Sequence, residues 1–245
     1  MRLTPLRIAM WSGPRNISTA LMRAWENRAD CVVWDEPLYG YYLQATGIQH
    51  PGAAEVIAAR GTDLDSIIAR CSGDIPAGKD IFYQKHMTLH LLPEIERSWL
   101  SALVNCFLIR EPEAVIASYA AVRSDATLED IGFIQQAELF EQVHAMSGEI
   151  PMVIDSREFL LDPETMLRAI CAKLDIMFVP EMLSWPKGPR ASDGVWAKYW
   201  YESVCNSTGF APYHDKNYSL SNKNREIALR ARPYYEDLYR YRLQP

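Results

Sequence analysis

The chain has 245 residues, 49% of them hydrophobic, which is enough to bury the core of one α/β domain. Its formal net charge at pH 7 is −6, and this acidic balance excludes a nucleic acid or other polyanion held by a broad basic surface. Any anion site must therefore be local, built from a few placed cations and backbone amides.

Five widely spaced cysteines without a C-x-x-C pair are typical of reduced thiols in a reducing compartment. The apolar run before the first turn spans residues 8–11, whereas a signal peptide needs about 7–15 apolar residues and a membrane-spanning helix about 20. We therefore expect a cytoplasmic protein that does not associate with membranes.

Short apolar runs alternate with helical patterns along the chain. The sequence predicts strands at residues 7–11, 31–34, 80–84, 103–109 and 151–154, and helices at 17–27, 112–122, 128–146 and 164–174. Strands that are apolar without alternation, separated by helices, predict an α/β fold with a parallel sheet covered on both faces. In such sheets ligands bind at the carboxyl ends of the strands, beside helix N-termini.

Beyond about residue 180 the chain is rich in Trp, Tyr, Lys and Gly, which indicates a lid-like segment followed by helices. No linker is long or polar enough to separate a second domain. We expect one domain over residues 1–245.

The first predicted turn has the composition of an anion site. Residues 8–21 read IAMWSGPRNISTAL, an apolar run that breaks into a turn and then a helix start. A Walker A loop, G-x-x-x-x-G-K-[ST], laid from Gly13 would need Gly at Ser18, Lys at Thr19 and Ser or Thr at Ala20. What remains is a helix N-terminus with two hydroxyls and Arg15, a set that suits a doubly charged oxyanion bound without metal. An ordinary strand–helix turn with a solvated Arg15 remains the alternative.

Two further segments carry candidate residues at predicted strand ends. In LIREPEAVIASYAAVR, residues 108–123, Arg110 leaves a strand and Ser118 lies eight residues beyond it; a local ion pair of Arg110 with a neighbouring glutamate is the alternative. In DIFYQKHMTLHLLP, residues 80–93, His86 is expected just past the end of a strand, where a neutral imidazole can accept a proton. A structural core histidine is the competing interpretation.

Taken together, these pieces resemble the sulfotransferases that use 3′-phosphoadenosine 5′-phosphosulfate (PAPS). Pro14-Arg15-Asn16-Ile17-Ser18-Thr19 lines up with the family's 5′-phosphosulfate loop, Pro-Lys-Ser-Gly-Thr-Thr. Arg110, Pro112 and Ser118 reproduce the spacing of its 3′-phosphate motif. The segment at residues 84–93 is similar to the Lys-Thr-His-Leu-Pro segment that supplies a catalytic His, and residues 186–196 resemble the part that closes over the nucleotide.

The resemblance implies a three-layer α/β/α fold of the P-loop NTPase-like, sulfotransferase type, with PAPS as co-substrate and no metal. It implies that the co-substrate is bound by Gly13, Pro14, Arg15, Asn16, Ile17, Ser18, Thr19, Arg110, Ser118, Lys187, Gly188 and Arg190. Two departures stand out: Arg15 replaces the family's Lys, and Ile17 its Gly. Arginine does not release a proton near neutral pH, so Arg15 can stabilise charge but cannot act as a general acid.

The implied reaction moves a sulfuryl group from PAPS to a hydroxyl, or an amine, of a small acceptor. Arg15 would stabilise the transition state, and the base would be His86 or Glu36, which follows a strand in VVWDEPLYGYY; the two are weighed equally. The alternatives are a P-loop phosphotransferase, with Asp35 or Asp155 recruiting magnesium, and a nucleotide-binding protein without turnover. The identity of the acceptor and the oligomeric state are not encoded in any motif.

Overall fold

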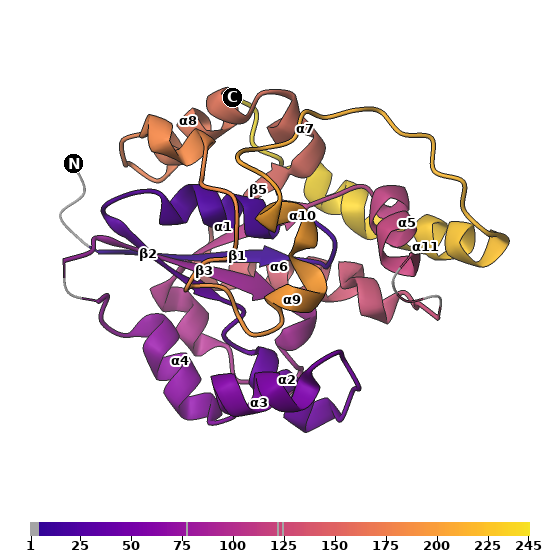
Figure 1. Ribbon diagram of the computed structural model, residues 1–245, viewed down its shortest axis with the longest axis horizontal. Coiled ribbons are helices and arrows are strands. Elements are labelled where there is room, and N and C mark those ends of the chain that lie inside the picture. The colour runs from indigo at the N-terminus through magenta and orange to yellow at the C-terminus, as the bar shows by residue number, and fades with distance from the viewer. Residues whose placement is uncertain (1–4, 77, 122, 124) are drawn as a thin grey trace.

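The sheet has five strands, all parallel. The computed structural model describes residues 5–76, 78–121, 123 and 125–245. The strand order is β2-β3-β1-β4-β5, with β1 at the centre (Figure 1). The bounds are β1 Leu6–Ser12, β2 Cys31–Asp35, β3 Ile81–Met87, β4 Val104–Ile109 and β5 Met152–Asp155. The predicted parallel sheet and its five strands are confirmed.

Helices cover both faces of this sheet, so the predicted three-layer α/β/α architecture is also confirmed. The helices are α1 Ser18–Glu26, α2 Tyr39–Thr46, α3 Ala53–Arg60, α4 Leu64–Ser72, α5 Pro112–Ala120, α6 Phe133–Ser147, α7 Ser156–Leu161, α8 Pro163–Lys173, α9 Ala197–Trp200, α10 Glu202–Cys205 and α11 Asn222–Tyr239. In Figure 1, α1, α7 and α8 lie above the sheet, and α2, α3 and α4 lie below it.

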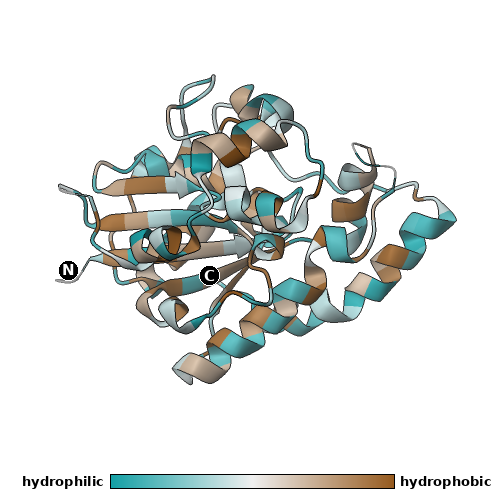
Figure 2. Ribbon diagram, turned by 90° about the horizontal axis from the view of Figure 1, so that it is seen from below, coloured by the Kyte–Doolittle hydropathy of each residue, from teal (hydrophilic) through white to brown (hydrophobic). Residues whose placement is uncertain are grey.

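The strands lack polar alternation because both of their faces are buried. All seven residues of β3 are buried, and in β1 Ile8 and Met10 pack toward one helical layer while Ala9 and Trp11 pack toward the other. Figure 2 shows brown, apolar segments along the strands, whereas hydrophilic and apolar colours alternate along the helices. Burial of these runs is the main favourable free-energy contribution to the sheet.

Helix starts and stops follow local chemistry. Pro112 stands at the start of α5, and the Asp162 carboxylate caps α8 by accepting a hydrogen bond from the Thr165 amide. The helix predicted at 128–146 is instead a short 3-10 turn and α6, because Gly132 between them has a φ of 73°. The predicted end of α5 at residue 122 lies outside the described residues.

The C-terminal segment reaches across the ends of the strands. Figure 1 shows α9 and α10 in front of the carboxyl ends of the central strands, followed by an extended stretch that leads to α11. α11 packs against α5 and α6. No helix of the described part of the chain is long and apolar enough to cross a bilayer.

Candidate functional site

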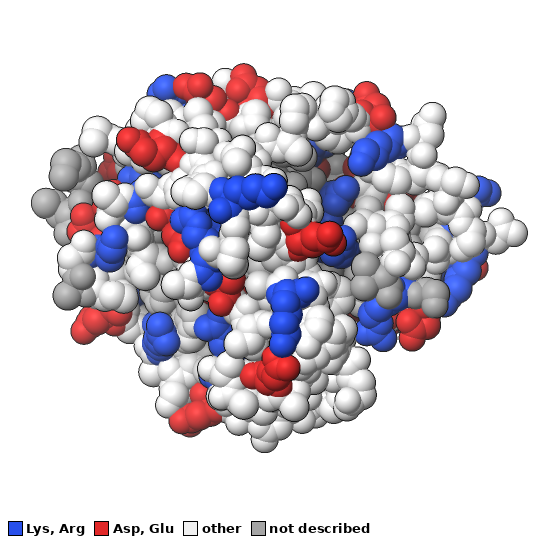
Figure 3. All heavy atoms as spheres, in the orientation of Figure 1, with Lys and Arg blue, Asp and Glu red and all other residues white. Residues whose placement is uncertain are grey.

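A cavity of about 390 Å³ lies at the carboxyl ends of the strands, where ligands bind in open parallel sheets. Its walls come from the turn after β1, the residues that follow β2, β3 and β4, and the α9–α10 segment. On the face drawn in Figure 3, acidic and basic side chains are interspersed, so the cation cluster described below is local.

The turn after β1 holds the N-terminus of α1 toward this cavity. A Cβ on Gly13 would lie 2.8 Å from the Ile131 carbonyl oxygen, so only glycine fits there. The Asn16 side chain bonds the Leu108 carbonyl at 3.1 Å and accepts the Ile17 amide at 2.8 Å, which fixes the turn. α1 has no side-chain cap, and Ser18 and Thr19 line the cavity, so amides of its first turn are left for a ligand.

Two guanidinium groups face each other beside this helix start. Arg15, with a φ of 57°, donates from Nε to Ser118 Oγ at 2.9 Å, and Arg110 donates to the Arg15 carbonyl oxygen. Burial lowers the pKa of Arg15, and the positive charge of Arg110 lowers it further. Among the described residues, no carboxylate lies within ion-pairing distance of either group. Two adjacent cations without a counter-ion form a site for an anion.

Across the cavity a buried network surrounds the ammonium group of Lys85. Its Nζ donates to Asp35 Oδ1 at 2.9 Å, to Glu36 Oε1 at 2.5 Å and to the Tyr201 hydroxyl at 2.7 Å. Burial lowers the pKa of Lys85, but the two carboxylates outweigh burial and hold this pKa well above its ordinary value. Lys85 is therefore charged, and it fixes one oxygen of Glu36.

The second oxygen of Glu36 points toward His90. Glu36 Oε2 lies 3.9 Å from His90 Nδ1, a buried nitrogen without a hydrogen-bond partner in the described part of the chain. Burial holds the pKa of His90 well below its ordinary value, so the ring is neutral. Glu36 has a φ of 43°, a strained value for this residue type that recurs at functional sites. Both side chains line the cavity, and an oxygen placed between them can bond to both.

His86, in contrast, lies in the core. The prediction that it follows the end of a strand is wrong, because β3 stays paired with β1 through Ser12 and Met87. The His86 ring stacks on Trp11 with a centroid distance of 4.3 Å, bonds Gln84 at 3.1 Å and is 1% exposed. His86 is not among the residues that line the cavity.

A comparison with models of protein families identifies the family of this chain. The family model described as "Sulfotransferase domain" matches residues 6–240. The chain belongs to the sulfotransferase domain family. The resemblance to sulfotransferases deduced from the motifs is thereby confirmed at the level of the family.

Solved structures of sulfotransferases share the fold at low sequence identity. A sulfotransferase domain from the curacin biosynthetic pathway superposes with a TM-score of 0.54 at 15% identity, covering 94% of this chain and 98% of that one. A sulfotransferase from Alicyclobacillus acidocaldarius gives a TM-score of 0.56 at 12% identity, covering 98% of each chain. At these identities the likeness shows the fold alone.

Two curated relatives from Arabidopsis thaliana are closer in sequence. They are named branched-chain-amino-acid aminotransferase-like protein 1 and 2, and are 34% and 33% identical to this chain over 237 and 207 residues. The alignments cover 96% and 83% of this chain but 42% and 36% of the relatives. The chain thus spans less than half the length of the relatives that it matches.

The predicted co-substrate residues divide into two groups. Pro14, Arg15, Asn16, Ile17, Ser18, Thr19, Arg110 and Ser118 line one cavity with Glu36. Gly13, Lys187, Gly188 and Arg190 do not line it. The Arg190 guanidinium instead bonds Glu26 at 3.1 Å and Asn27 at 3.0 Å, beside the end of α1.

Sequence reasoning missed several residues of the cavity wall. The sequence motifs assign no role to Lys85, His90 or Tyr201. The strand predicted at residues 80–84 ends just before Lys85, whereas the structure buries this charge inside β3, where it requires buried counter-charges.

Acid should destabilise the folded chain through His86. Burial, with smaller contributions from His90 and Lys85, lowers the pKa of His86 to about 3, whereas an unfolded histidine titrates near pH ~6.5. The unfolded state therefore binds more protons between these values, so this stability is complete above pH ~6.5 and falls as the pH falls toward 3. At pH ~5 the loss from this group is about 2 kcal/mol.

Urea unfolding at pH ~7 and ~5 measures this effect. We expect His86→Asn to lose less free energy of unfolding than the parent chain between the two pH values. His214→Asn, at an exposed position, should behave like the parent. An unchanged pH dependence in His86→Asn would contradict a buried neutral imidazole.

Proposed function

We propose that this sulfotransferase moves a sulfuryl group from PAPS to a hydroxyl, or an amine, of a small acceptor. One observation carries the proposal: the unpaired Arg15 and Arg110 at the start of α1 share one cavity with the carboxylate of Glu36. The two cations suit a highly charged donor, and the carboxylate suits removal of a proton from an acceptor.

The donor's two anionic groups have separate partners. The 5′-phosphosulfate would lie on the free amides of α1, with hydrogen bonds from Ser18 and Thr19 and charge from Arg15. The 3′-phosphate would be held by Arg110 and Ser118, which selects this nucleotide over ATP. A phosphate next to the two guanidinium groups would also relieve their mutual repulsion.

The transfer is an in-line displacement in which positioning and charge stabilisation do most of the catalysis. The acceptor oxygen forms a bond to sulfur, the bond between sulfur and the bridging phosphate oxygen breaks, and the acceptor proton passes to Glu36 Oε2. Arg15 stabilises the negative charge that builds on the leaving phosphate. Lys85 holds Glu36 in place through Oε1, and His90 Nδ1, as an N–H tautomer, can donate to the acceptor oxygen.

A phosphotransferase on this scaffold has less support. Asp155 accepts the Arg157 and Glu158 amides at 2.9 and 3.0 Å and the Tyr235 hydroxyl at 3.0 Å. Asp35 is held by Lys85 and Tyr201. Both carboxylates that would recruit magnesium are therefore engaged in structural contacts, and the loop lysine of such enzymes is absent from the first turn.

Calorimetric titration tests the choice of nucleotide. We expect adenosine 3′,5′-bisphosphate to bind much more tightly than ADP, and the affinity to be the same with magnesium or with a chelator. The reason is that Arg110 and Ser118 contact a 3′-phosphate that ADP lacks. Equal affinities, or binding that requires magnesium, would refute the proposed donor.

A further inference from the structure

The end of the cavity beside Glu36 is lined by aromatic rings. We call Tyr39, Tyr42, His50, His90 and Trp200 the aromatic end, since all five line the cavity. The His90 ring lies 4.5 Å from Tyr39 and 4.7 Å from Tyr42, between centroids, and His50 lies 6.3 Å from Trp200. The Tyr39 hydroxyl bonds His50 Nδ1 at 2.8 Å, which holds these rings together.

The charge at the aromatic end is negative. The carboxylates of Glu36 and Asp130 line the cavity here, and Asp35 lies behind Glu36. Lys85 is the lining cation at this end in the described part of the chain, and three groups already hold it: Asp35, Glu36 and the Tyr201 hydroxyl. Among the described residues that line this end, the carboxylates of Glu36 and Asp130 therefore outnumber the one cation, Lys85, while Arg60, behind the lining over the Trp196 ring, balances Asp35.

The histidines add no positive charge. Burial lowers the pKa of His50, Arg123 lowers it further, and Glu36 and Asp130 act in the opposite direction. Both carboxylates line the same cavity as His50. Arg123 does not line the cavity and pairs with Asp125 at 3.6 Å. Rings without charge, next to surplus carboxylates, form a site that attracts a cation and repels an anion.

A polar anchor lies beside the rings. His90 is 3% exposed, lines the cavity, and its Nδ1 has no partner among the described residues. A buried polar atom of this kind costs free energy unless a ligand satisfies it. With Glu36 Oε2 3.9 Å away, a ligand hydroxyl has a donor and an acceptor at the border of the aromatic end.

We propose that the acceptor is a small alcohol that carries a quaternary ammonium group. The ammonium group occupies the aromatic end, close to Asp130, and the hydroxyl lies between Glu36 Oε2 and His90 Nδ1. This inference rests on the proposed sulfuryl transfer, because it assigns the hydroxyl to the base of that reaction. The anionic donor then occupies the positive end of the cavity, at Arg15 and Arg110, and the cationic acceptor occupies the negative aromatic end.

Choline and its uncharged carbon isostere, 3,3-dimethyl-1-butanol, test the inference because they differ in charge and little in shape. The full chain is first saturated with adenosine 3′,5′-bisphosphate, and each alcohol is then titrated calorimetrically. We expect choline to bind at least about tenfold more tightly, as cation–π contacts in a desolvated site allow. Equal affinity for the two alcohols, or no detectable binding of either, overturns the inference about the acceptor. Because the bisphosphate still binds in that case, the proposed function is not affected. Failure of the bisphosphate to bind is instead a failure of the proposed function.

A matched pair of variants assigns the preference to the rings. Tyr42→Phe keeps the aromatic face and should keep the preference for choline, whereas Tyr42→Leu should reduce the affinity ratio several-fold. Both variants should bind the bisphosphate like the parent chain, which shows that they are folded. An undiminished choline preference in Tyr42→Leu, and also in Trp200→Leu, would place the cation elsewhere and overturn the assignment.

Discussion

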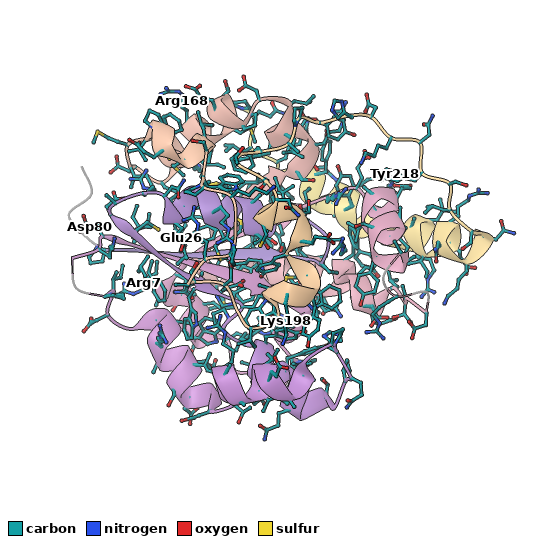
Figure 4. The ribbon with its side chains drawn as sticks, in the orientation of Figure 1. Arg7, Glu26, Asp80, Arg168, Lys198 and Tyr218 are labelled. Carbon is teal, nitrogen blue, oxygen red and sulfur yellow. The ribbon has the colours of Figure 1, made fainter. Side chains whose placement is uncertain are left out.

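Replacing Arg110 with alanine is expected to weaken binding of adenosine 3′,5′-bisphosphate about 30-fold to 4,000-fold. The reason is that loss of one partner from a buried, hydrogen-bonded charge pair costs about 2–5 kcal/mol, and each 1.4 kcal/mol is a factor of about ten. Calorimetry on the purified variant measures the loss directly. Arg168→Ala, on α8 at the outer surface (Figure 4), is the control and should leave the affinity unchanged.

Arg110 also donates to the Arg15 carbonyl, so its loss can act through the turn instead of through the ligand. Adenosine 5′-phosphate, which lacks the 3′-phosphate, separates these routes. If Arg110 holds the 3′-phosphate, Arg110→Ala lowers the affinity for the bisphosphate far more than the affinity for the monophosphate. An equal loss for both nucleotides would mean that Arg110 braces the turn, and the assigned role would be wrong.

Replacing Glu36 with glutamine is expected to lower kcat about 10²-fold to 10⁴-fold, the range for loss of a positioned base. Glutamine keeps the size of the side chain and an oxygen that can accept from Lys85, but it cannot take the acceptor proton. Donor affinity should stay close to that of the parent, because Glu36 lies across the cavity from Arg15 and Arg110. Mass-spectrometric detection of sulfated product, with adenosine bisphosphate binding as the check on folding, gives both quantities.

His86→Asn is the comparison variant in this experiment, because the sequence alone does not distinguish His86 from Glu36 as the base. Its core position predicts a kcat within a few-fold of the parent. A loss of turnover in His86→Asn together with retained turnover in Glu36→Gln would reverse the assignment of the base.

The strands were predictable to within a few residues because their signal is local. Continuous apolar runs mark all five, and the largest error, at the end of β3, has a physical cause. The apolar run stops before Gln84, yet the strand continues to Met87. The three polar residues in between are buried because each has a partner: Gln84 donates a hydrogen bond, Lys85 forms an ion pair and His86 stacks on an aromatic ring.

The convergence of the turn after β1 with Arg110 and Ser118 was predictable for a similar reason. The turn after β1 and the Arg110–Ser118 spacing are short motifs, and a parallel sheet brings the ends of β1 and β4 together. Arg190 shows the limit of such matching: its surroundings depend on how the segment after residue 180 packs on α1, and there Glu26 and Asn27 take up the guanidinium.

The aromatic end could not be derived from local patterns. Its residues come from α2, the turn after β3 and α9, and α9 lies more than 100 positions beyond the other two. Lys85 finds Asp35 at a separation of 50 residues and Tyr201 at 116. Only the tertiary fold decides which buried charge meets which partner.

The network around Lys85 also bears on the order in which the molecule assembles during synthesis. Asp35, Glu36 and Lys85 are made early, whereas Tyr201, which donates to Asp35 at 2.8 Å, is made late. Because an incompletely paired buried charge is costly, the strand ends of a growing chain should stay hydrated until Tyr201 emerges. Formation of the complete cavity wall would then be among the last folding events, so that a ribosome-bound fragment contains most of the sheet but an incomplete cavity.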